Sequence, residues 1–423
     1  MKKLKIVGVV VVLLLLAGLV GTAQVGAKAP EEEWNKTFGG RATGCAVAQT
    51  SDGGYIILGN PPRLIKTDPT GNEEWNKTFS GTDYSVNTFA QTSDGGYIIV
   101  GVRLYYGRGR LYGLSDILLI KTDSNGNEEW TKRFRLDGSN YNNGYSVAQT
   151  PDGGYIITGS AVYNFGRSDL LLIKTDSNGN EEWNKTFGGS GGNTGFSVAL
   201  TSDGGYIIAG YTESYGAGEA DAWLIKTDAS GNEQWNRTFG TKSGTEWAIS
   251  AQQTSDSGYI LTGHTGSYNA WLIKTDINGD KQWDKTFSKG NYSRGDLIIQ
   301  TSDGGYIIAG HTYKGWGTIK HGLLLIKTDS RGNEEWVKII EGVEALDFTE
   351  GPYVAQTFDG GYIAVATRLG GGIYLIKLGY AAAPGKKTAP EIPTGEEKGI
   401  TGFEAVFAIA GLLAVAYIFR RRK

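Results

Sequence analysis

Short runs of apolar or alternating residues recur along this chain, and each run is bounded by Gly, Asp or Asn. Such runs are typical of β-strands separated by tight turns. Three landmarks repeat in a fixed order, seven times each and about 41–58 residues apart, which is the repeat length of propeller blades. The first is a Trp that follows acidic residues or Gln: Trp34, Trp75, Trp130, Trp183, Trp235, Trp283 and Trp336. The second is an Asp-Gly-Gly-Tyr turn, once Asp-Ser-Gly-Tyr, starting at Asp52, Asp94, Asp152, Asp203, Asp256, Asp303 and Asp359. The third is Leu-Ile-Lys, ending at Lys66, Lys121, Lys174, Lys226, Lys274, Lys327 and Lys377.

Each repeat contains four strand-like runs, which we call A to D in chain order. In the third repeat we expect them at Ser146–Thr150, Tyr155–Thr158, Leu170–Thr175 and Glu181–Phe187. Asp-Gly between A and B, and Asp-Ser-Asn-Gly-Asn between C and D, are hairpin signals because Gly accepts a positive φ without steric cost. Four antiparallel strands repeated seven times predict an all-β fold, a seven-bladed β-propeller.

The two ends of the repeat region predict how the ring closes. The first landmark belongs to an isolated strand D at Glu31–Phe38, and the last repeat has strands A to C between Val354 and Lys377 but no strand D. We therefore expect the N-terminal strand to complete the last blade, which would remove the open sheet edges.

The segments outside the repeats predict export and anchoring. Residues 1–27 combine a basic start, an apolar stretch and small residues, as a signal peptide does, with cleavage expected after Ala27 or Ala23; a retained anchor is the alternative. The propeller domain would then span residues 28–380. Residues 381–399 are small, charged and Pro-containing, which predicts a flexible stalk. Residues 400–423 are apolar and end in Arg-Arg-Arg-Lys, which predicts a transmembrane helix with a cytoplasmic tail.

This C-terminal segment resembles the archaeal PGF-CTERM sorting signal, which has a Pro-Gly-Phe tripeptide, an apolar span and an Arg-rich end. Thr401, Gly402 and Phe403 stand at the tripeptide. The resemblance implies an archaeal cell-surface protein whose tail an archaeosortase cuts and relinks to lipid. Since Thr401 replaces the Pro, a plain transmembrane anchor is the alternative. Residues 31–378 are similar to propeller repeats of bacterial and archaeal surface proteins, which implies the fold but no particular activity.

Composition excludes several classes of function. Lys and Arg (41) nearly balance Asp and Glu (44), and the net charge of −3 argues against a nucleic-acid partner. A single cysteine excludes an intramolecular disulfide and a Cys-based zinc site. No nucleophile-elbow, zinc-protease or P-loop motif is present. We therefore expect no cofactor, no resident metal and, on balance, no enzymatic activity.

The loops predict one recognition face. The A–B and C–D turns are short and nearly identical in every repeat, whereas the B–C and D–A loops on the opposite face vary and are rich in aromatic residues. Variable loops on a rigid scaffold commonly carry recognition. The candidate ligand-binding residues on this face are Arg103, Tyr105, Tyr106, Arg108, Tyr163, Arg167, Tyr211, Tyr215, Tyr268 and Trp316.

These residues favour a cell-surface binding or adhesion protein that recognises a glycan or a protein. Two alternatives remain: a polysaccharide hydrolase or lyase, and a structural envelope component. A hydrolase would need a carboxylate pair, for which the candidates are Glu213, Glu219, Asp221 and Glu246. The repeated Trp and Lys residues are expected to be structural, because a sevenfold repeat is poor evidence for one catalytic site. Five Asn-x-Ser/Thr sequons are candidate glycosylation sites: Asn35, Asn76, Asn184, Asn236 and Asn291.

Overall fold

The computed structural model describes residues 28–79, 83–105, 114–163, 167–314, 320–344 and 353–379. Within these ranges the chain forms strands and turns, and none of them contains a helix long and apolar enough to span a membrane. The predicted signal peptide, stalk and transmembrane segment lie outside the described residues.

The strands follow one another as repeated antiparallel sets of four. Strand β1 is Glu32–Phe38, and the next set is β2 (Thr43–Gln49), β3 (Tyr55–Asn60), β4 (Arg63–Thr67) and β5 (Glu73–Thr78). The second set is β6 (Tyr84–Gln91), β7 (Tyr97–Tyr105), β8 (Leu114–Thr122) and β9 (Glu128–Phe134). The third set is β10 (Tyr141–Gln149), β11 (Tyr155–Val162), β12 (Ser168–Thr175) and β13 (Glu181–Phe187). The fourth set is β14 (Asn193–Leu200), β15 (Tyr206–Thr212), β16 (Asp221–Thr227) and β17 (Glu233–Phe239).

The remaining strands complete the series. One set is β18 (Trp247–Gln253), β19 (Tyr259–His264), β20 (Ala270–Thr275) and β21 (Lys281–Phe287). Another is β22 (Tyr292–Gln300), β23 (Tyr306–Lys314), β24 (Lys320–Thr328) and β25 (Glu334–Glu341). The last strands are β26 (Val343–Glu344), β27 (Tyr353–Gln356), β28 (Tyr362–Arg368) and β29 (Ile373–Leu378).

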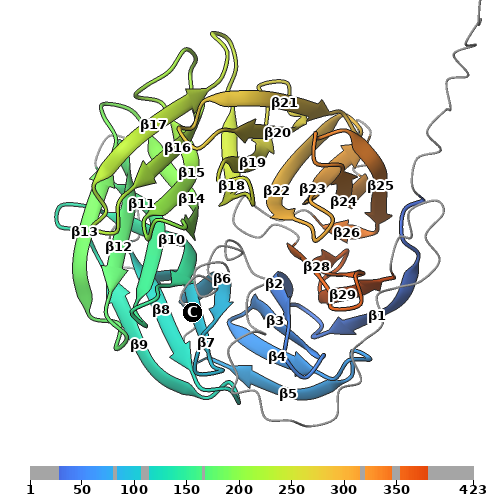
Figure 1. The fold of residues 1–423 in the computed structure, drawn as a ribbon. Coiled ribbons are helices and arrows are strands. Elements are labelled where there is room, and N and C mark those ends of the chain that lie inside the picture. The colour runs from blue at the N-terminus through green and yellow to red at the C-terminus, as the bar shows by residue number, and fades with distance from the viewer. Residues whose placement is uncertain are drawn as a thin grey trace, which may run out of the picture.

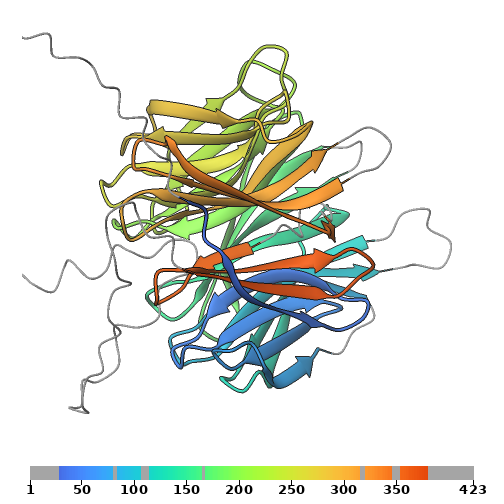
Figure 2. The same cartoon turned by 90° about the vertical axis from the view of Figure 1, so that its right-hand side faces the viewer.

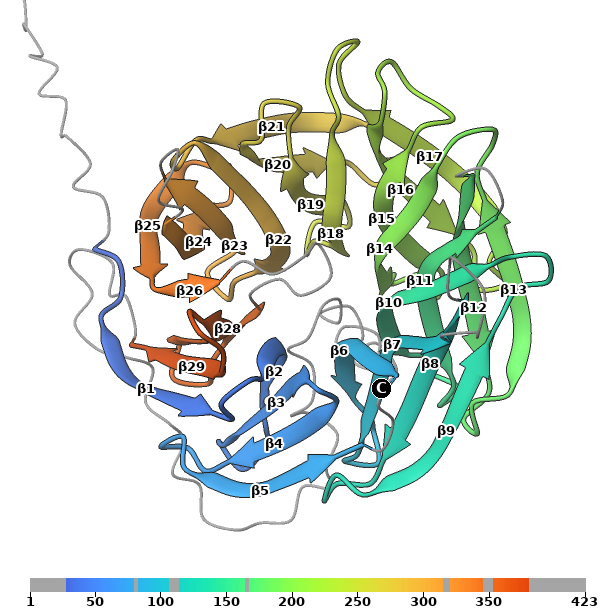
Figure 3. The same ribbon diagram turned by 180° about the vertical axis from the view of Figure 1, so that it is seen from behind.

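The sheets stand around a central axis, so the molecule has the shape of a propeller (Figure 1). The first strand of each set lies near the axis and the fourth forms the rim, and Figure 3 shows the same order from behind. Seen edge-on in Figure 2, the connections between strands emerge at two opposite faces. We call each four-stranded set a blade and name it by its strands.

Hydrogen bonding divides the described strands into six sheets rather than the seven separate units that the repeats predict. The difference arises in one place: the β6–β9 and β10–β13 blades share an eight-stranded sheet. They are joined by a single parallel pair, Tyr141 with Ser115, between the start of β10 and the start of β8. Each of the two sets remains antiparallel within itself.

The predicted closure of the ring by the N-terminal strand is confirmed. Strand β1 pairs antiparallel with β29, with Trp34 opposite Lys377. Around the seam, the Trp34 ring meets the Tyr55 ring edge-on at 5.7 Å, and the Phe358 N–H donates to Gln49 Oε1 at 2.8 Å. The first and last parts of the chain are thus held by the same contacts that join neighbouring blades elsewhere.

The inner strands are longer than the sequence predicts. Strand β10 begins at Tyr141 rather than at Ser146, because a β-bulge between Gly144 and Ser146 lets the pairing with β11 continue beyond it. Strand β11 accordingly runs on to Val162. A bulge adds one residue to one strand and shifts the phase of alternation, so the apolar pattern alone places the strand end too early.

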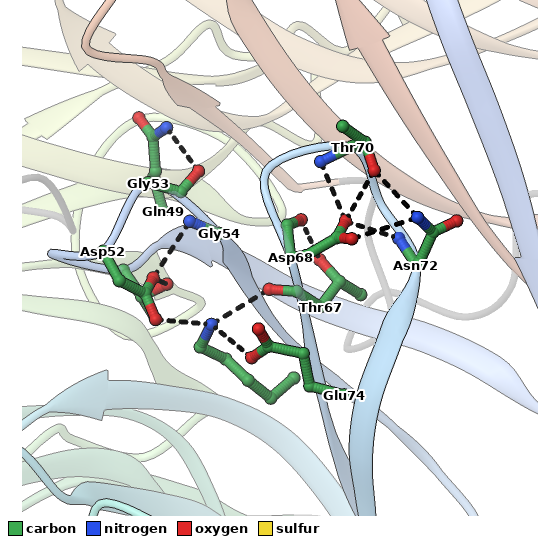
Figure 4. Close-up of polar contacts among 11 residues, drawn as sticks. Gln49, Asp52, Gly53, Gly54, Thr67, Asp68, Thr70, Asn72 and Glu74 are labelled. Atoms are coloured by element: carbon green, nitrogen blue, oxygen red, sulfur yellow. Dashed lines mark hydrogen bonds and ion pairs between the residues drawn. The ribbon is translucent and has the colours of Figure 1, made fainter.

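The A–B and C–D turns lie on one face, as predicted, and a buried lysine connects them. Lys66 Nζ lies 2.8 Å from Asp52 of the A–B turn and 2.9 Å from Glu74, just after the C–D turn. It also donates to the Thr67 carbonyl at 2.9 Å. Figure 4 shows Asp52, Thr67 and Glu74 converging on this amine. The equivalent lysines repeat the arrangement with Asp partners in every blade: Lys121, Lys174, Lys226, Lys274, Lys327 and Lys377.

The repeated tryptophans join neighbouring blades and are structural, as expected. Trp34 packs against Gly71 in the C–D turn of the next blade, where a Cβ would lie only 2.6 Å from the indole ring. Gly71 also has a φ of +81°, which favours glycine there. The same Trp-on-Gly contact recurs at Trp75, Trp130, Trp183, Trp235 and Trp283. These rings are therefore occupied within the scaffold and do not face a ligand.

Candidate functional site

An unbroken chain of aromatic rings joins four neighbouring blades, from β10 to β24. We call it the aromatic arc. Successive ring centroids lie 4.6–6.3 Å apart, within the range of favourable aromatic pairing. Its members are Tyr145, Phe196, Tyr211, Trp247, His264, Tyr268, Tyr292, His311, Tyr313 and His321.

Strand geometry explains why these rings meet. Tyr145 and Phe196 are the bulge residues of β10 and β14, and their rings lie 5.5 Å apart although they belong to different blades. Cross-strand partners on one face lie close enough for their side chains to interact. Trp247 of β18 is thus paired with His264 of β19, and Tyr292 of β22 with Tyr313 of β23.

Tyr268 is the most exposed ring of the arc and has an unusual backbone. Its side chain is 52% exposed, and its φ of 55° lies in the left-handed region that large residues rarely adopt. The conformation is fixed by two hydrogen bonds: the Tyr268 N–H donates to the Thr265 carbonyl, and the Ser293 N–H donates to the Tyr268 carbonyl, both at 2.8 Å. A backbone outlier held in this way makes Tyr268 a candidate functional residue. The Tyr268 ring stacks between those of His264 and Tyr292.

The histidines at the base of the arc are buried. Burial lowers the pKa of His264 to about 4, so this imidazole is neutral at physiological pH. Its Nδ1 lies 3.1 Å from the Thr265 carbonyl. His311 contacts the buried Asp296, with Nδ1 2.7 Å from Oδ2. Burial by itself would raise the pKa of Asp296, but the neighbouring Arg294, whose Nε lies 2.6 Å from Oδ1, and His311 lower it overall.

A second group of candidate residues lies at the β6–β9 blade. The Arg103 guanidinium lies 4.7 Å from the centre of the Tyr105 ring, a cation–π distance. The Tyr105 hydroxyl donates to Asp116 Oδ2 at 2.6 Å, and Arg135 Nε lies 2.5 Å from Asp116 Oδ1. Tyr105 is thus held by partners from its own blade, a role that the sequence did not predict for it.

The other predicted residues are distributed as follows. Arg167 lies 5.5 Å from the Tyr163 ring and 3.1 Å from Asp169, so this pair forms a cluster of its own. Tyr215 is half-exposed, donates its hydroxyl to the Gly188 carbonyl and contacts Trp223. Tyr211 and Tyr268 are the two predicted residues that belong to the arc. The following lie outside the described residues: Tyr106, Arg108, Trp316, Thr401, Gly402 and Phe403.

The loop pattern in the sequence does not identify most of the arc, because most of its rings lie on strands rather than in loops. One signal was present. In Asn-Asn-Gly-Tyr-Ser-Val-Ala and Asn-Thr-Gly-Phe-Ser-Val-Ala the residue after Gly varies while its neighbours are nearly constant. Those variable positions are the bulge residues Tyr145 and Phe196, and a position that varies inside a constant repeat is where one blade can differ from another.

The candidate acids do not form an accessible pair. Asp221 and Glu246 are buried, and Glu213 Oε2 accepts a hydrogen bond from the Gly192 N–H at 2.9 Å. No group of three or more His, Cys, Asp or Glu side chains with metal-binding geometry occurs in the ranges that the structure describes. The sequon residues with exposed side chains are Asn35, Asn76, Asn184 and Asn291. Asn236 is half-buried and accepts a hydrogen bond from Trp223 Nε1 at 3.3 Å.

Comparison with known proteins identifies the tail and the fold. Residues 402–422 match the PGF-CTERM motif, so Gly402 and Phe403 lie inside the match and Thr401 just before it. No curated protein sequence matches the chain. The β-propeller domain of Cps50 (Swd1) from Myceliophteria thermophila is similar in structure, with a TM-score of 0.52 and 11% identity, covering 82% of this chain and 99% of that one.

Two further solved structures are more distant. YCF48 bound to D1 peptide has a TM-score of 0.47 and 13% identity over 84% of this chain and 100% of that one. A protein of unknown function from Dyadobacter fermentans has a TM-score of 0.49 and 9% identity over 71% of this chain and 96% of that one. The chain is thus a β-propeller protein with a PGF-CTERM sorting tail, and that motif indicates a secreted, surface-anchored protein.

Proposed function

We propose that this surface-anchored propeller is a seven-bladed binding protein that holds an extracellular glycan on its aromatic arc. The anchor at one end and the closed ring would display the variable-loop face outside the cell. Binding would rest on several contacts to a preformed surface, with no covalent chemistry.

The observation that carries the proposal is the continuity of the arc across blades. Ten rings from four blades touch in sequence, and at its most exposed point Tyr268 is fixed in a left-handed conformation. Core packing does not need such an arrangement, because an apolar cluster and a Trp-on-Gly contact already join each pair of neighbouring blades here. A row of rings with apolar faces and polar edges suits a ligand that is itself both apolar and polar.

A glycan fits this surface better than a protein partner does. Sugar rings present C–H faces that pack on aromatic rings and hydroxyl groups that bond to tyrosine hydroxyls. The arc is narrow and its largest rings are half-buried, whereas a stable protein interface usually needs about 800 Å² on each partner. The buried positions of Asp221 and Glu246 do not favour the alternative of a hydrolase, since a substrate would not reach them.

The test is a glycan array probed with the full chain in detergent micelles, followed by titration calorimetry on the best ligand. We expect saturable binding that Tyr268→Asn weakens about tenfold or more, since a central aromatic contact contributes about 1–2 kcal/mol. Asn tolerates a positive φ, so this variant removes the ring and retains the loop conformation.

Tyr215→Ala is the matched control, because Tyr215 is as exposed as Tyr268 but lies outside the arc. It should bind like the wild type. If the wild type and Tyr268→Asn bind the glycan equally well and have the same melting temperature, the aromatic arc is not the binding site. Reducing ends released from the bound polysaccharide would point to hydrolysis, and binding to a protein without any glycan signal would assign the face to a protein partner.

A further inference from the structure

Two buried acidic side chains face each other where the β14–β17 blade meets the β18–β21 blade. Asp221 is the first residue of β16, and Glu246 lies immediately before β18. Figure 1 shows these two strands in neighbouring blades. Their residues are only 1% and 3% exposed. A Cβ added to Gly240 would lie 2.0 Å from Asp221 Oδ1 and 3.0 Å from Glu246 Oε2, so these two oxygens are at most about 5 Å apart. Only a glycine at position 240 allows the Asp221 carboxylate to approach the backbone this closely.

The equivalent junction one blade earlier contains an amide instead of the second acid. There Asp169 takes the place of Asp221, Gly188 that of Gly240 and Asn193 that of Glu246. Asn193 Nδ2 donates to the carbonyls of Ser168 and Gly191, each at 3.0 Å, so this amide is satisfied within the protein. The exchange of Asn for Glu therefore introduces an additional acidic group at this junction.

The hydrogen bonds of the two acids leave one side of the pair open. Asp221 Oδ2 accepts from the N–H groups of Ala217 and Gly218 at 2.9 and 3.0 Å. Glu246 Oε1 accepts from Thr241 Oγ1 at 3.0 Å. Glu246 Oε2, by contrast, is buried and has no hydrogen-bond partner among the described residues. A buried carboxylate oxygen without a partner is strongly unfavourable unless a cation or a proton compensates it.

We propose that Asp221 and Glu246 form a calcium site. Calcium prefers oxygen ligands from carboxylates, backbone carbonyls and water, in flexible arrangements of six to eight. Two carboxylates would balance the charge of a divalent ion. The same loop offers neutral oxygens as well: the carbonyls of Thr241 and Gly244 lie 2.4 and 2.7 Å from the position of a Cβ on Gly218, next to the Asp221 carboxylate that Gly218 N–H binds.

This site does not depend on the proposed glycan binding. It has a structural consequence for the arc, however. Glu246 precedes Trp247 directly, and Asp221 is paired with Thr212, the neighbour of Tyr211. The rings of Tyr211 and Trp247 stack at 4.8 Å. An ion that links β16 to the start of β18 would therefore hold the two blades together beneath this stacked pair.

The test uses terbium, a luminescent trivalent ion with the ligand preference of calcium, on the full chain in detergent micelles after removal of metals with EDTA. Because Trp247 and Trp223 are close in sequence to the two acids, excitation of tryptophan should sensitise terbium emission. We expect a saturable signal that calcium displaces, and a melting temperature that calcium raises.

Glu246→Gln and Gly240→Ala should each weaken terbium and calcium binding at least tenfold. The first removes a charge but retains the shape, and the second places a methyl group that would displace the Asp221 carboxylate. Asp169→Asn changes the equivalent acid of the preceding blade and should bind calcium like the wild type. Each variant is first checked for a wild-type circular dichroism spectrum.

Two results would overturn the proposal. If calcium neither displaces terbium nor raises the melting temperature of the wild type, the site does not bind calcium. If Glu246→Gln raises the melting temperature without calcium and calcium adds nothing to either protein, the two carboxylates share a proton instead. Loss of glycan binding in the glycan experiment, with calcium binding intact, would affect only the function proposed above.

Discussion

The buried lysine of each blade lies among acidic or amide partners. In the β10–β13 blade Lys174 Nζ lies 2.8 Å from Asp152 and 3.0 Å from Glu182. In the β14–β17 blade Lys226 has one acidic partner, Asp203, and its other contact is Gln234 Oε1 at 2.9 Å. The same geometry therefore occurs with one carboxylate and with two.

This natural difference predicts a stabilising substitution. Gln234→Glu should raise the free energy of unfolding by about 0.5 kcal/mol, because the new carboxylate is half-exposed and solvent weakens the gain. Glu182→Gln should lower it by a similar amount. Urea unfolding at low and high salt measures both. Both effects on the free energy of unfolding should be smaller at 1 M NaCl. If Gln234→Glu has the same free energy of unfolding as the wild type at low salt, the second acid does not stabilise the protein.

At this scale the sequence predicts contacts that repeat and misses contacts that do not. The lysine and its acidic partners recur in every blade, so they were expected. The bond from Tyr105 to Asp116 links strands β7 and β8, and Arg135 from beyond β9 contacts the same carboxylate. The repeat pattern does not predict the position of Arg135, so the sequence analysis assigned Tyr105 as a candidate ligand-binding residue.

Five of the junctions between neighbouring blades are also joined by a glutamine at the end of the inner strand. Its side-chain oxygen accepts a hydrogen bond from the backbone N–H of the preceding blade's A–B turn, as Gln253 does from Ser202 at 2.8 Å and Gln149 from Ser93 at 2.7 Å. The junction between the β10–β13 and β14–β17 blades lacks the bond. There Pro151, which has no N–H, occupies the turn, and Leu200 occupies the glutamine position.

The missing bond can be restored by a double substitution. Pro151→Ser with Leu200→Gln should stabilise the protein by about 1 kcal/mol more than the sum of the two single changes, the typical value of one hydrogen bond. Leu200→Gln alone should be destabilising, because the new amide would have no partner. Thermal and urea unfolding of the wild type, the two single variants and the double variant give the coupling energy of this double-mutant cycle. A coupling energy near zero would show that this junction does not adopt the geometry of the others.

Strand identity and hairpin pairing were predictable from turn residues and alternation. The bulges were not, because a bulge adds a residue without changing composition. The bulge residues Tyr145 and Phe196 begin the aromatic arc. In β10 and β14, therefore, the position that the sequence failed to predict is the one that contributes to the candidate site.

For the whole molecule, ring closure followed from a count of strands, because the first and last repeats are each incomplete and complement one another. The arc could not be derived in this way. Its rings come from four blades, and contacts between blades depend on the twist and tilt of the sheets. Of the ten ring residues, the loop pattern identified only Tyr211 and Tyr268 as candidate ligand contacts.

The repetition of one acidic turn in every blade predicts how the whole ring responds to acid. Burial alone would raise the pKa of these aspartates, but the lysine, the Thr hydroxyl and a Gly N–H that bind each carboxylate lower it, to about 2 for Asp152. The same direction holds for the other A–B turns, at Asp52, Asp94, Asp203, Asp256, Asp303 and Asp359.

A carboxyl group whose pKa is lower in the folded state than in the unfolded state stabilises the folded state above the unfolded pKa. This stabilisation is lost as the pH falls towards the folded pKa. Since the groups act on one cooperative ring, we expect the melting temperature to fall most steeply between about pH 4 and pH 2. Asp152→Asn should make this fall shallower, while Glu219→Gln, at an exposed acid in a B–C loop, should leave its slope unchanged. If the melting temperature stays constant from pH 4 to pH 2, the charge on these aspartates does not stabilise the turns. The turns would then be held by the buried lysines alone.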